Sequence, residues 1–303
     1  MRGWRLPWVL PTLVLAGAAV LAMTGVAALG LGLRAAFVLA SAAPAGGVLL
    51  LAIARVTGAP WTSVGAPIRA LPWIVGLGII ATLSALPASI PPHLSWWAHP
   101  IAVTLRVGLA FAGLAWGGAR LRAGAGVTFA ALLLTLYAWL ITPIAADLLL
   151  AAEPSHPVSA IGMMLFLVQF AAGCIAGILS ADGRERRDLM LLLVAALLGL
   201  CYLGFMDYLV IWFGNLPQRV PFYLDRPGWP AALVVVVAIG GGIAGAALNR
   251  PILQAASGIG ALVVAVLWWM GCGPVATLVA LIGSPMSTLS WHGRGRGRGR
   301  GHG

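Results

Sequence analysis

The sequence predicts an all-α membrane protein, a polytopic bundle of about ten transmembrane helices with both termini in the cytoplasm. Three observations support this fold class. Of the 303 residues, 61% are apolar and 8% charged, whereas a soluble domain has about 25% charged residues. Apolar stretches of membrane-spanning length recur along the whole chain, and the arginines are distributed unevenly between the two sets of connections.

Each predicted helix is an apolar stretch bounded by Pro, Gly or Arg. About 20 residues cross ~30 Å of hydrocarbon at 1.5 Å per residue, so nearly all the stretches are long enough and the last is marginal. The first is too long for the core of a cleavable signal, so we expect it to remain as a helix. The ten stretches are 8–30, 35–54, 72–90, 100–118, 126–150, 158–180, 189–213, 230–247, 252–270 and 274–290.

Arginine sets the predicted orientation, because basic residues near helix ends are retained on the cytoplasmic side. The chain has 18 Lys and Arg, all of them Arg. An inner N-terminus places 14 arginines inside and three outside, namely Arg34, Arg219 and Arg226, with Arg106 inside a helix. This distribution predicts an even number of crossings.

The connections leave no room for a soluble cofactor domain. The longest, 55–71 and 214–229, have 17 and 16 residues, well below the ~40 needed for independent folding. Cys174, Cys201 and Cys272 form no CxxC or CxxCH motif, so we interpret them as small core residues. We therefore expect residues 1–290 to form one integral membrane domain that binds no metal or redox cofactor of its own.

The C-terminal segment, residues 291–303, predicts a disordered cytoplasmic tail rich in Gly and Arg. A nucleic-acid-binding segment is one interpretation of such a pattern. A tail that leaves a membrane helix meets anionic lipid first, so we expect lipid or no specific partner, and no nucleic acid.

Three ionisable residues lie within the predicted helices: Arg106, Asp147 and Asp207. The rise per residue places Arg106 and Asp207 ~9 Å, and Asp147 ~4.5 Å, inside the outer ends of their helices. Since an unpaired charge in the membrane costs ~2.5–3.5 kcal/mol, such residues usually find a partner inside the bundle. A pair of Arg106 with Asp207 is sterically possible, and we expect Asp147 to reach outward. No predicted helix contains a histidine; His93, His99 and His156 fall in outer loops.

Two interpretations of this polar group remain open. One is a proton-handling or quinone-headgroup site in which Asp207 titrates and Tyr202, Tyr208 and Gln169 donate or accept hydrogen bonds. The other is a structural ion pair that fixes the register of the helices.

The segment 205–229, FMDYLVIWFGNLPQRVPFYLDRPGW, is the most distinctive in the chain. Its turn, Gly214-Asn215-Leu216-Pro217, resembles the corresponding turn in the second large membrane subunit of alternative complex III, a bacterial quinol:cytochrome c oxidoreductase related to polysulfide-reductase NrfD-type subunits. Further pieces are similar in the same order: TGAPWTSVGAPIRAL at 57–71, Arg106, Trp139, Glu153-Pro154 and Gln169.

The resemblance covers roughly 34–270 and implies a multi-pass subunit of the bacterial inner membrane without a redox centre of its own. It implies other membrane and periplasmic subunits as partners, with haem c and iron–sulfur clusters on those chains, and a contribution to quinone binding or proton translocation. Polar positions common in the family are replaced here by Ala138, Met206-Asp207 and Gln218-Arg219. The alternative interpretation is a stand-alone multi-pass transporter, since ten helices are common in that class.

Overall fold

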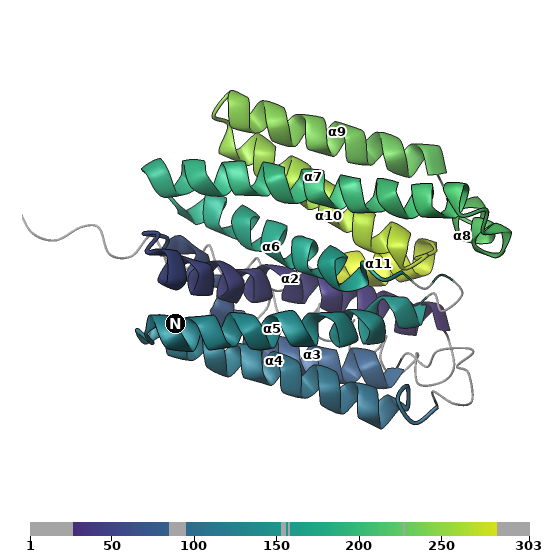
Figure 1. The fold of residues 1–303 in the computed structure, drawn as a ribbon, viewed down its shortest axis with the longest axis horizontal. Coiled ribbons are helices and arrows are strands. Elements are labelled where there is room, and N and C mark those ends of the chain that lie inside the picture. The colour runs from purple at the N-terminus through teal and green to yellow at the C-terminus, as the bar shows by residue number, and fades with distance from the viewer. Residues whose placement is uncertain (1–26, 85–94, 153–155, 157, 227, 284–303) are drawn as a thin grey trace, which may run out of the picture.

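The computed structural model describes residues 27–84, 95–152, 156, 158–226 and 228–283. Every regular element in this part of the chain is a helix (Figure 1). Seven of these described helices are long and apolar enough to cross a membrane, as a polytopic helix bundle requires. The total of ten crossings and the side on which the termini lie remain predictions.

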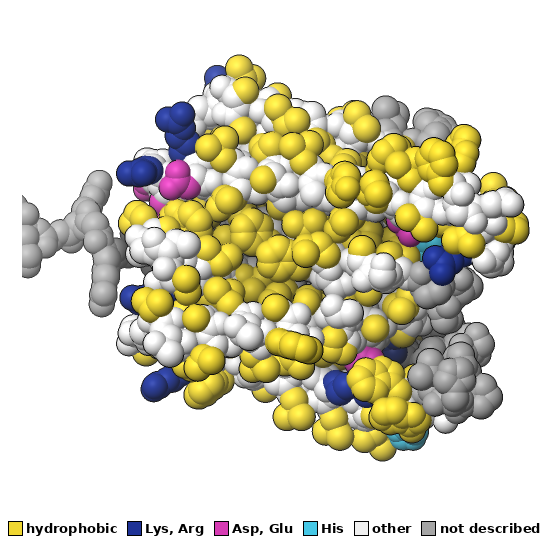
Figure 2. All heavy atoms as spheres, viewed as in Figure 1, with side chains coloured by type: hydrophobic (Ala, Val, Ile, Leu, Met, Phe, Trp, Pro, Cys, Tyr) yellow, Lys and Arg dark blue, Asp and Glu magenta, His cyan; other side chains and the backbone are white. Residues whose placement is uncertain are grey.

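Two groups of helices flank a central pair, α2 (Ala27–Thr57) and α6 (Ile161–Ser180) (Figure 1). On one side, α2 contacts the first group, and on the other α6 contacts the second. Figure 2 shows apolar side chains over much of one face, with Arg and acidic side chains gathered toward its two ends. The first group is α3 (Leu71–Ser84), α4 (Pro100–Arg122) and α5 (Val127–Leu148); the second is α7 (Gly183–Phe213), α9 (Gly228–Ala247) and α10 (Pro251–Trp269).

Shorter elements connect the bundle helices. α8 (Val220–Leu224) lies in the loop between α7 and α9, and α11 (Pro274–Gly283) packs against α2. The described connections also contain 3₁₀ turns: η1 (Ser63–Gly65), η2 (Pro67–Ala70), η4 (Leu150–Ala152) and η5 (Pro217–Arg219).

Small residues permit the close approach of the two central helices. A Cβ atom added at Gly46 of α2 would collide with the carbonyl oxygen of Gln169, and one added at Gly173 would meet the Gly46 backbone at 2.6–2.9 Å. Helices in lipid associate through such residues, which let backbones pack closely. Glycine is therefore required at this crossing by the lack of space.

The prediction of an outer loop around Arg34 is wrong. Residues 27–57 form one continuous helix, so the end of the first predicted stretch and the second stretch belong together. The sequence GLGL at 30–33 suggested a break, but Gly32 packs against Ala276 and Val279 of α11, where a Cβ would have no room. Arg34 is consequently buried within α2; residues 8–26 of the first stretch lie outside the described residues.

Apart from α8, which was not predicted, the other described helices begin within three residues of their predicted starts, except for α7. It starts at Gly183, six residues before the predicted 189, because its charged first turns also fold as helix. There Glu185 accepts hydrogen bonds from the backbone N–H groups of Thr62 and Ser63, both at 2.9 Å, and from the Ser63 hydroxyl at 2.6 Å. The loop after α2 is thereby held against the start of α7.

Candidate functional site

The turn after α7 folds back the segment that builds the site. Asn215 has a positive φ of 47°, which Asn tolerates better than most residues. The N–H of Leu216 bonds to the carbonyl of Ile211 at 3.2 Å, and that of Asn215 to Trp212 at 3.2 Å. This is a Schellman motif, so the predicted end of the helix at Gly214-Asn215-Leu216-Pro217 is confirmed.

Asp207 lies at the centre of a buried polar cluster. Its Oδ2 atom accepts a hydrogen bond from the Tyr223 hydroxyl at 2.6 Å and lies 2.9 Å from Nε2 of His156. Asp207 therefore does not form the pair with Arg106 that its depth in the membrane allowed. His156 does lie in a loop, as predicted, but its side chain is fully buried against α7.

Aromatic rings enclose His156. The ring of Phe222 stacks on it with centroids 3.7 Å apart, and Trp269 and Tyr223 approach at 5.7 and 5.9 Å. Such packing excludes water from most of the imidazole. His156 Nδ1 and Trp269 Nε1 are buried, and within the described part of the chain neither has a hydrogen-bond partner.

Arg226 joins the folded-back segment to the end of α10. Its guanidinium donates to the carbonyls of Phe222 and Trp268, each at 3.0 Å, and lies 3.8 Å from the centroid of the Phe222 ring. A cation at a helix C-terminus satisfies carbonyls that have no intrahelical partner. Arg226 therefore fixes Phe222 and Tyr223 relative to α10.

Tyr223 keeps its proton in this environment. Burial raises the pKa of Tyr223, and its hydrogen bond to the Asp207 carboxylate and the negative charge of that carboxylate raise the pKa further. The phenol is therefore neutral at physiological pH and acts as the donor toward Asp207.

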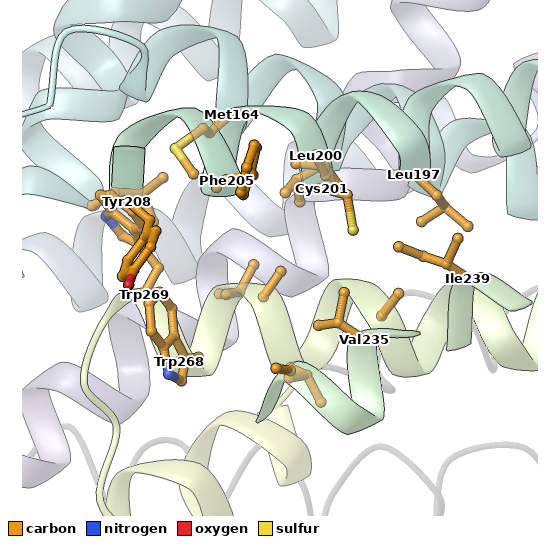
Figure 3. Close-up of a pocket in the computed structure, with 18 of the residues that line it drawn as sticks. Met164, Leu197, Leu200, Cys201, Phe205, Tyr208, Val235, Ile239, Trp268 and Trp269 are labelled. Atoms are coloured by element: carbon orange, nitrogen blue, oxygen red, sulfur yellow. The ribbon is translucent and has the colours of Figure 1, made fainter. Parts of the chain in front are cut away.

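A cavity of about 470 Å³ adjoins this cluster, between α6, α7, α9 and α10. Figure 3 shows its side chains, which are mostly apolar, including Leu200, Cys201, Phe205, Val235 and Ile239. Tyr208, Tyr223, Trp268 and Trp269 line the end nearest the cluster. The cavity thus has long apolar walls and one end with hydroxyl groups.

The candidate tyrosines have different surroundings. The ring of Tyr208 lies 5.7 Å from that of Tyr223, and its hydroxyl bonds to no residue that the structure describes. It is therefore close to Asp207, as expected, and available to a ligand. Tyr202 is 61% exposed and does not line the cavity.

Arg106 pairs with Asp147 instead of Asp207. Its Nε and Nη2 atoms donate to the two carboxylate oxygens at 2.8 and 2.7 Å, and Trp97 lies over the guanidinium at 4.0 Å. The Asp147 side chain is 3% exposed, so the expectation that it reaches outward is also wrong. Arg34 donates to the backbone carbonyl of Asp147 at 3.2 Å, which adds a cation that the sequence interpretation missed.

Gln169 is not a neighbour of Asp207. Its Oε1 atom accepts a 2.5 Å hydrogen bond from the hydroxyl of Tyr137 on α5, on the α4–α5 side of α6. Of the other pieces of the resemblance, Trp139 is 78% exposed, while Glu153-Pro154 lie outside the described residues. His93 and the tail, 291–303, also lie outside them.

The cysteines occupy different environments. Cys174 is buried and Cys201 and Cys272 are partly buried; burial raises the pKa of Cys272, in the turn after α10, to about 12. Within the described ranges, no three His, Cys, Asp or Glu side chains are grouped as a metal site requires.

Sequence reasoning missed His156, Tyr223 and Arg226. The last two lie in the distinctive segment, where an aromatic pair and an Arg directly follow a helix-ending turn, and that combination was the available signal. No sequence feature near His156 identifies it as a residue of the site.

The chain was compared with models of known protein families and with curated proteins, and neither comparison gives a match.

Proposed function

We propose that this protein is a multi-pass subunit of a quinol-oxidising electron-transfer complex of the alternative complex III type in a bacterial inner membrane, and that its α6–α10 cavity binds quinone. The observation that carries the proposal is the combination, in one cavity, of long apolar walls with a polar end at Tyr208 and Tyr223. The resemblance of segment 205–229 to the membrane subunit of alternative complex III supports the choice of complex.

The cavity suits the two parts of an isoprenoid quinone. Its volume of about 470 Å³ falls within the ~300–1,000 Å³ of small-molecule sites. The apolar walls of α7 and α9 would bury the tail. The hydroxyl of Tyr208, which bonds to no described residue, would donate to a carbonyl of the headgroup, which needs an oriented hydrogen bond more than a charge.

The cluster behind Tyr223 can take up protons. Oxidation of a quinol releases two electrons and two protons; the electrons would pass to a haem or iron–sulfur centre on a companion subunit. The Tyr223 oxygen can accept a proton from the quinol hydroxyl while its own proton moves to Asp207, 2.6 Å away. His156, 2.9 Å from the same carboxylate oxygen, can take that proton from Asp207, and Asp207 is then able to accept the second one, so that the cluster holds both protons.

Equilibrium binding of a short-tailed quinone to the purified full chain in nanodiscs tests the ligand. Gly204 lines the cavity, and a Cβ there meets nothing within 4 Å, so Gly204→Leu fills the cavity with little strain. Gly240 on α9 has the same free space and does not line the cavity, so Gly240→Leu is the matched control.

We expect wild-type and Gly240→Leu proteins to bind the quinone equally and Gly204→Leu to bind it about tenfold more weakly or not at all, a loss of ~1.4 kcal/mol or more. Unchanged binding by Gly204→Leu would exclude this cavity. Membership of a complex is tested separately by affinity purification from mild detergent, where recovery of the chain without a haem- or cluster-bearing partner would contradict it.

A further inference from the structure

A second groove lies on the other side of the molecule, between α4, α5 and α6. It has a volume of about 310 Å³, and its lining is apolar apart from Arg106, Tyr137 and Gln169. Tyr137 and Gln169 bond to each other. Arg106 is therefore the one charged side chain among the described residues that line this groove, and it lies near the α4 end that begins at Pro100.

The guanidinium of Arg106 is held in place with one edge unused. Its Nε and Nη2 atoms bond to Asp147, and Nη2 also donates to the Trp97 carbonyl at 2.7 Å. No described residue accepts a hydrogen bond from Nη1. The Arg106 side chain is 23% exposed and that of Asp147 only 3%, so a molecule in the groove meets the cation, with the carboxylate behind it.

We propose that this groove binds an anionic phospholipid, with one acyl chain between α4 and α5 and the phosphate oxygens bonded to Nη1 of Arg106. The planar guanidinium is suited to phosphate oxygens, and charge-assisted hydrogen bonds to it are strong. The aromatic ring of Trp97 on one face and the bond to Asp147 hold the donor in one orientation before the lipid arrives.

The dimensions of the groove fit one leaflet. From Arg106 to Leu114 the groove follows α4 for eight residues, ~12 Å, and from Ile144 to Leu133 it follows α5 for 11 residues, ~16 Å. A single leaflet contributes ~15 Å of hydrocarbon. A chain whose headgroup lies beside Arg106 would therefore extend along the groove toward the bilayer centre. The partly exposed guanidinium repels a headgroup that carries an ammonium, so the groove favours an anionic lipid over a zwitterionic one.

Native mass spectrometry of the delipidated full chain, titrated with phosphatidylglycerol or phosphatidylcholine of identical acyl chains, tests this site. Gly113 lines the groove and a Cβ there meets nothing within 4 Å, so Gly113→Leu fills the groove without touching the ion pair. Gly76 on α3 has the same free space outside the groove, which makes Gly76→Leu the matched control.

We expect wild-type and Gly76→Leu proteins to bind one phosphatidylglycerol about tenfold more tightly than phosphatidylcholine. Both lipids offer the same phosphate to Nη1, but only phosphatidylcholine brings an ammonium that the guanidinium repels, so the preference should be lost at high salt. In Gly113→Leu the preference disappears. Equal binding of the two lipids by the wild type, retention of the preference in Gly113→Leu, or displacement of the lipid by a short-tailed quinone would overturn the proposal. If Gly113→Leu is not monodisperse, the wild-type comparison of the two headgroups decides alone.

Discussion

Replacing Arg106 with Leu should destabilise the bundle by removing the partner of a buried carboxylate. In the wild type, two charge-assisted hydrogen bonds of 2.8 and 2.7 Å join Arg106 to Asp147, whose side chain is 3% exposed. The bond from Arg34 reaches the backbone carbonyl of Asp147 and cannot replace them. The variant therefore keeps a carboxylate inside the bundle without its bidentate donor.

The expected cost is about 3 kcal/mol. Breaking a buried ion pair by removing one partner costs ~3–5 kcal/mol in soluble proteins, and Arg106 is partly exposed, which favours the lower end. Hydrogen bonds between membrane helices are also weaker than those values imply. Adding Asp147→Asn removes the stranded charge, so the double variant should recover about 2 kcal/mol relative to Arg106→Leu alone.

Reversible unfolding in mixed detergent micelles, followed by far-UV circular dichroism, gives the four free energies of this double-mutant cycle. The cycle reports the interaction of the two side chains and not the general cost of each substitution. Additive effects of the two substitutions, with the double variant less stable than either single one, would refute the buried pair.

Three further predictions follow from the packing and the Asp207 cluster. Gly46→Leu should lower the melting temperature through a cost of ~1–3 kcal/mol at the α2–α6 crossing, while Gly76→Leu, in open space, leaves it unchanged; equal melting temperatures would show that the crossing is loose. Arg226→Gln removes charge-assisted bonds to the carbonyls of Phe222, Trp268 and Trp269, of which the two at 3.0 Å are worth ~1.5–3 kcal/mol each, so hydrogen exchange in Val220–Leu224 should accelerate. Unaltered protection would mean that other contacts hold α8. If Asp207 accepts the quinol protons as we propose, Asp207→Asn should lower quinol-driven turnover of the proposed complex at least ~100-fold; full activity at normal assembly would assign Asp207 a structural role.

The composition, together with the Gly, Pro and Arg residues that interrupt the apolar stretches, was sufficient to predict the class of fold and most described helices. The starts of α3, α4, α5, α9 and α10 follow from where Gly, Pro and Arg interrupt the apolar stretches, and those residues do bound the helices. The turn at Asn215 was visible as well, because Gly-Asn-Leu-Pro combines a tolerated positive φ with a residue that cannot continue the helix.

The pairing of polar groups could not be predicted in the same way. Rise per residue gives the depth of a side chain in the membrane but not its lateral neighbours. Arg106 and Asp147 lie on consecutive antiparallel helices and meet at one end, whereas Asp207 lies on α7, in the group of helices on the other side of the central pair. Arg34 was misplaced because a glycine needed for close packing has the same sequence signal as a glycine that ends a helix.

Photoaffinity labelling tests the central claim, that the cavity beside Tyr208 and Tyr223 binds a quinone, most directly. A short-tailed quinone with an azide on its ring should label the α7 and α8 peptides that contain these two tyrosines, and excess unmodified quinone should prevent the labelling. Labelling that is absent from both peptides, or that excess quinone fails to reduce, would contradict the account.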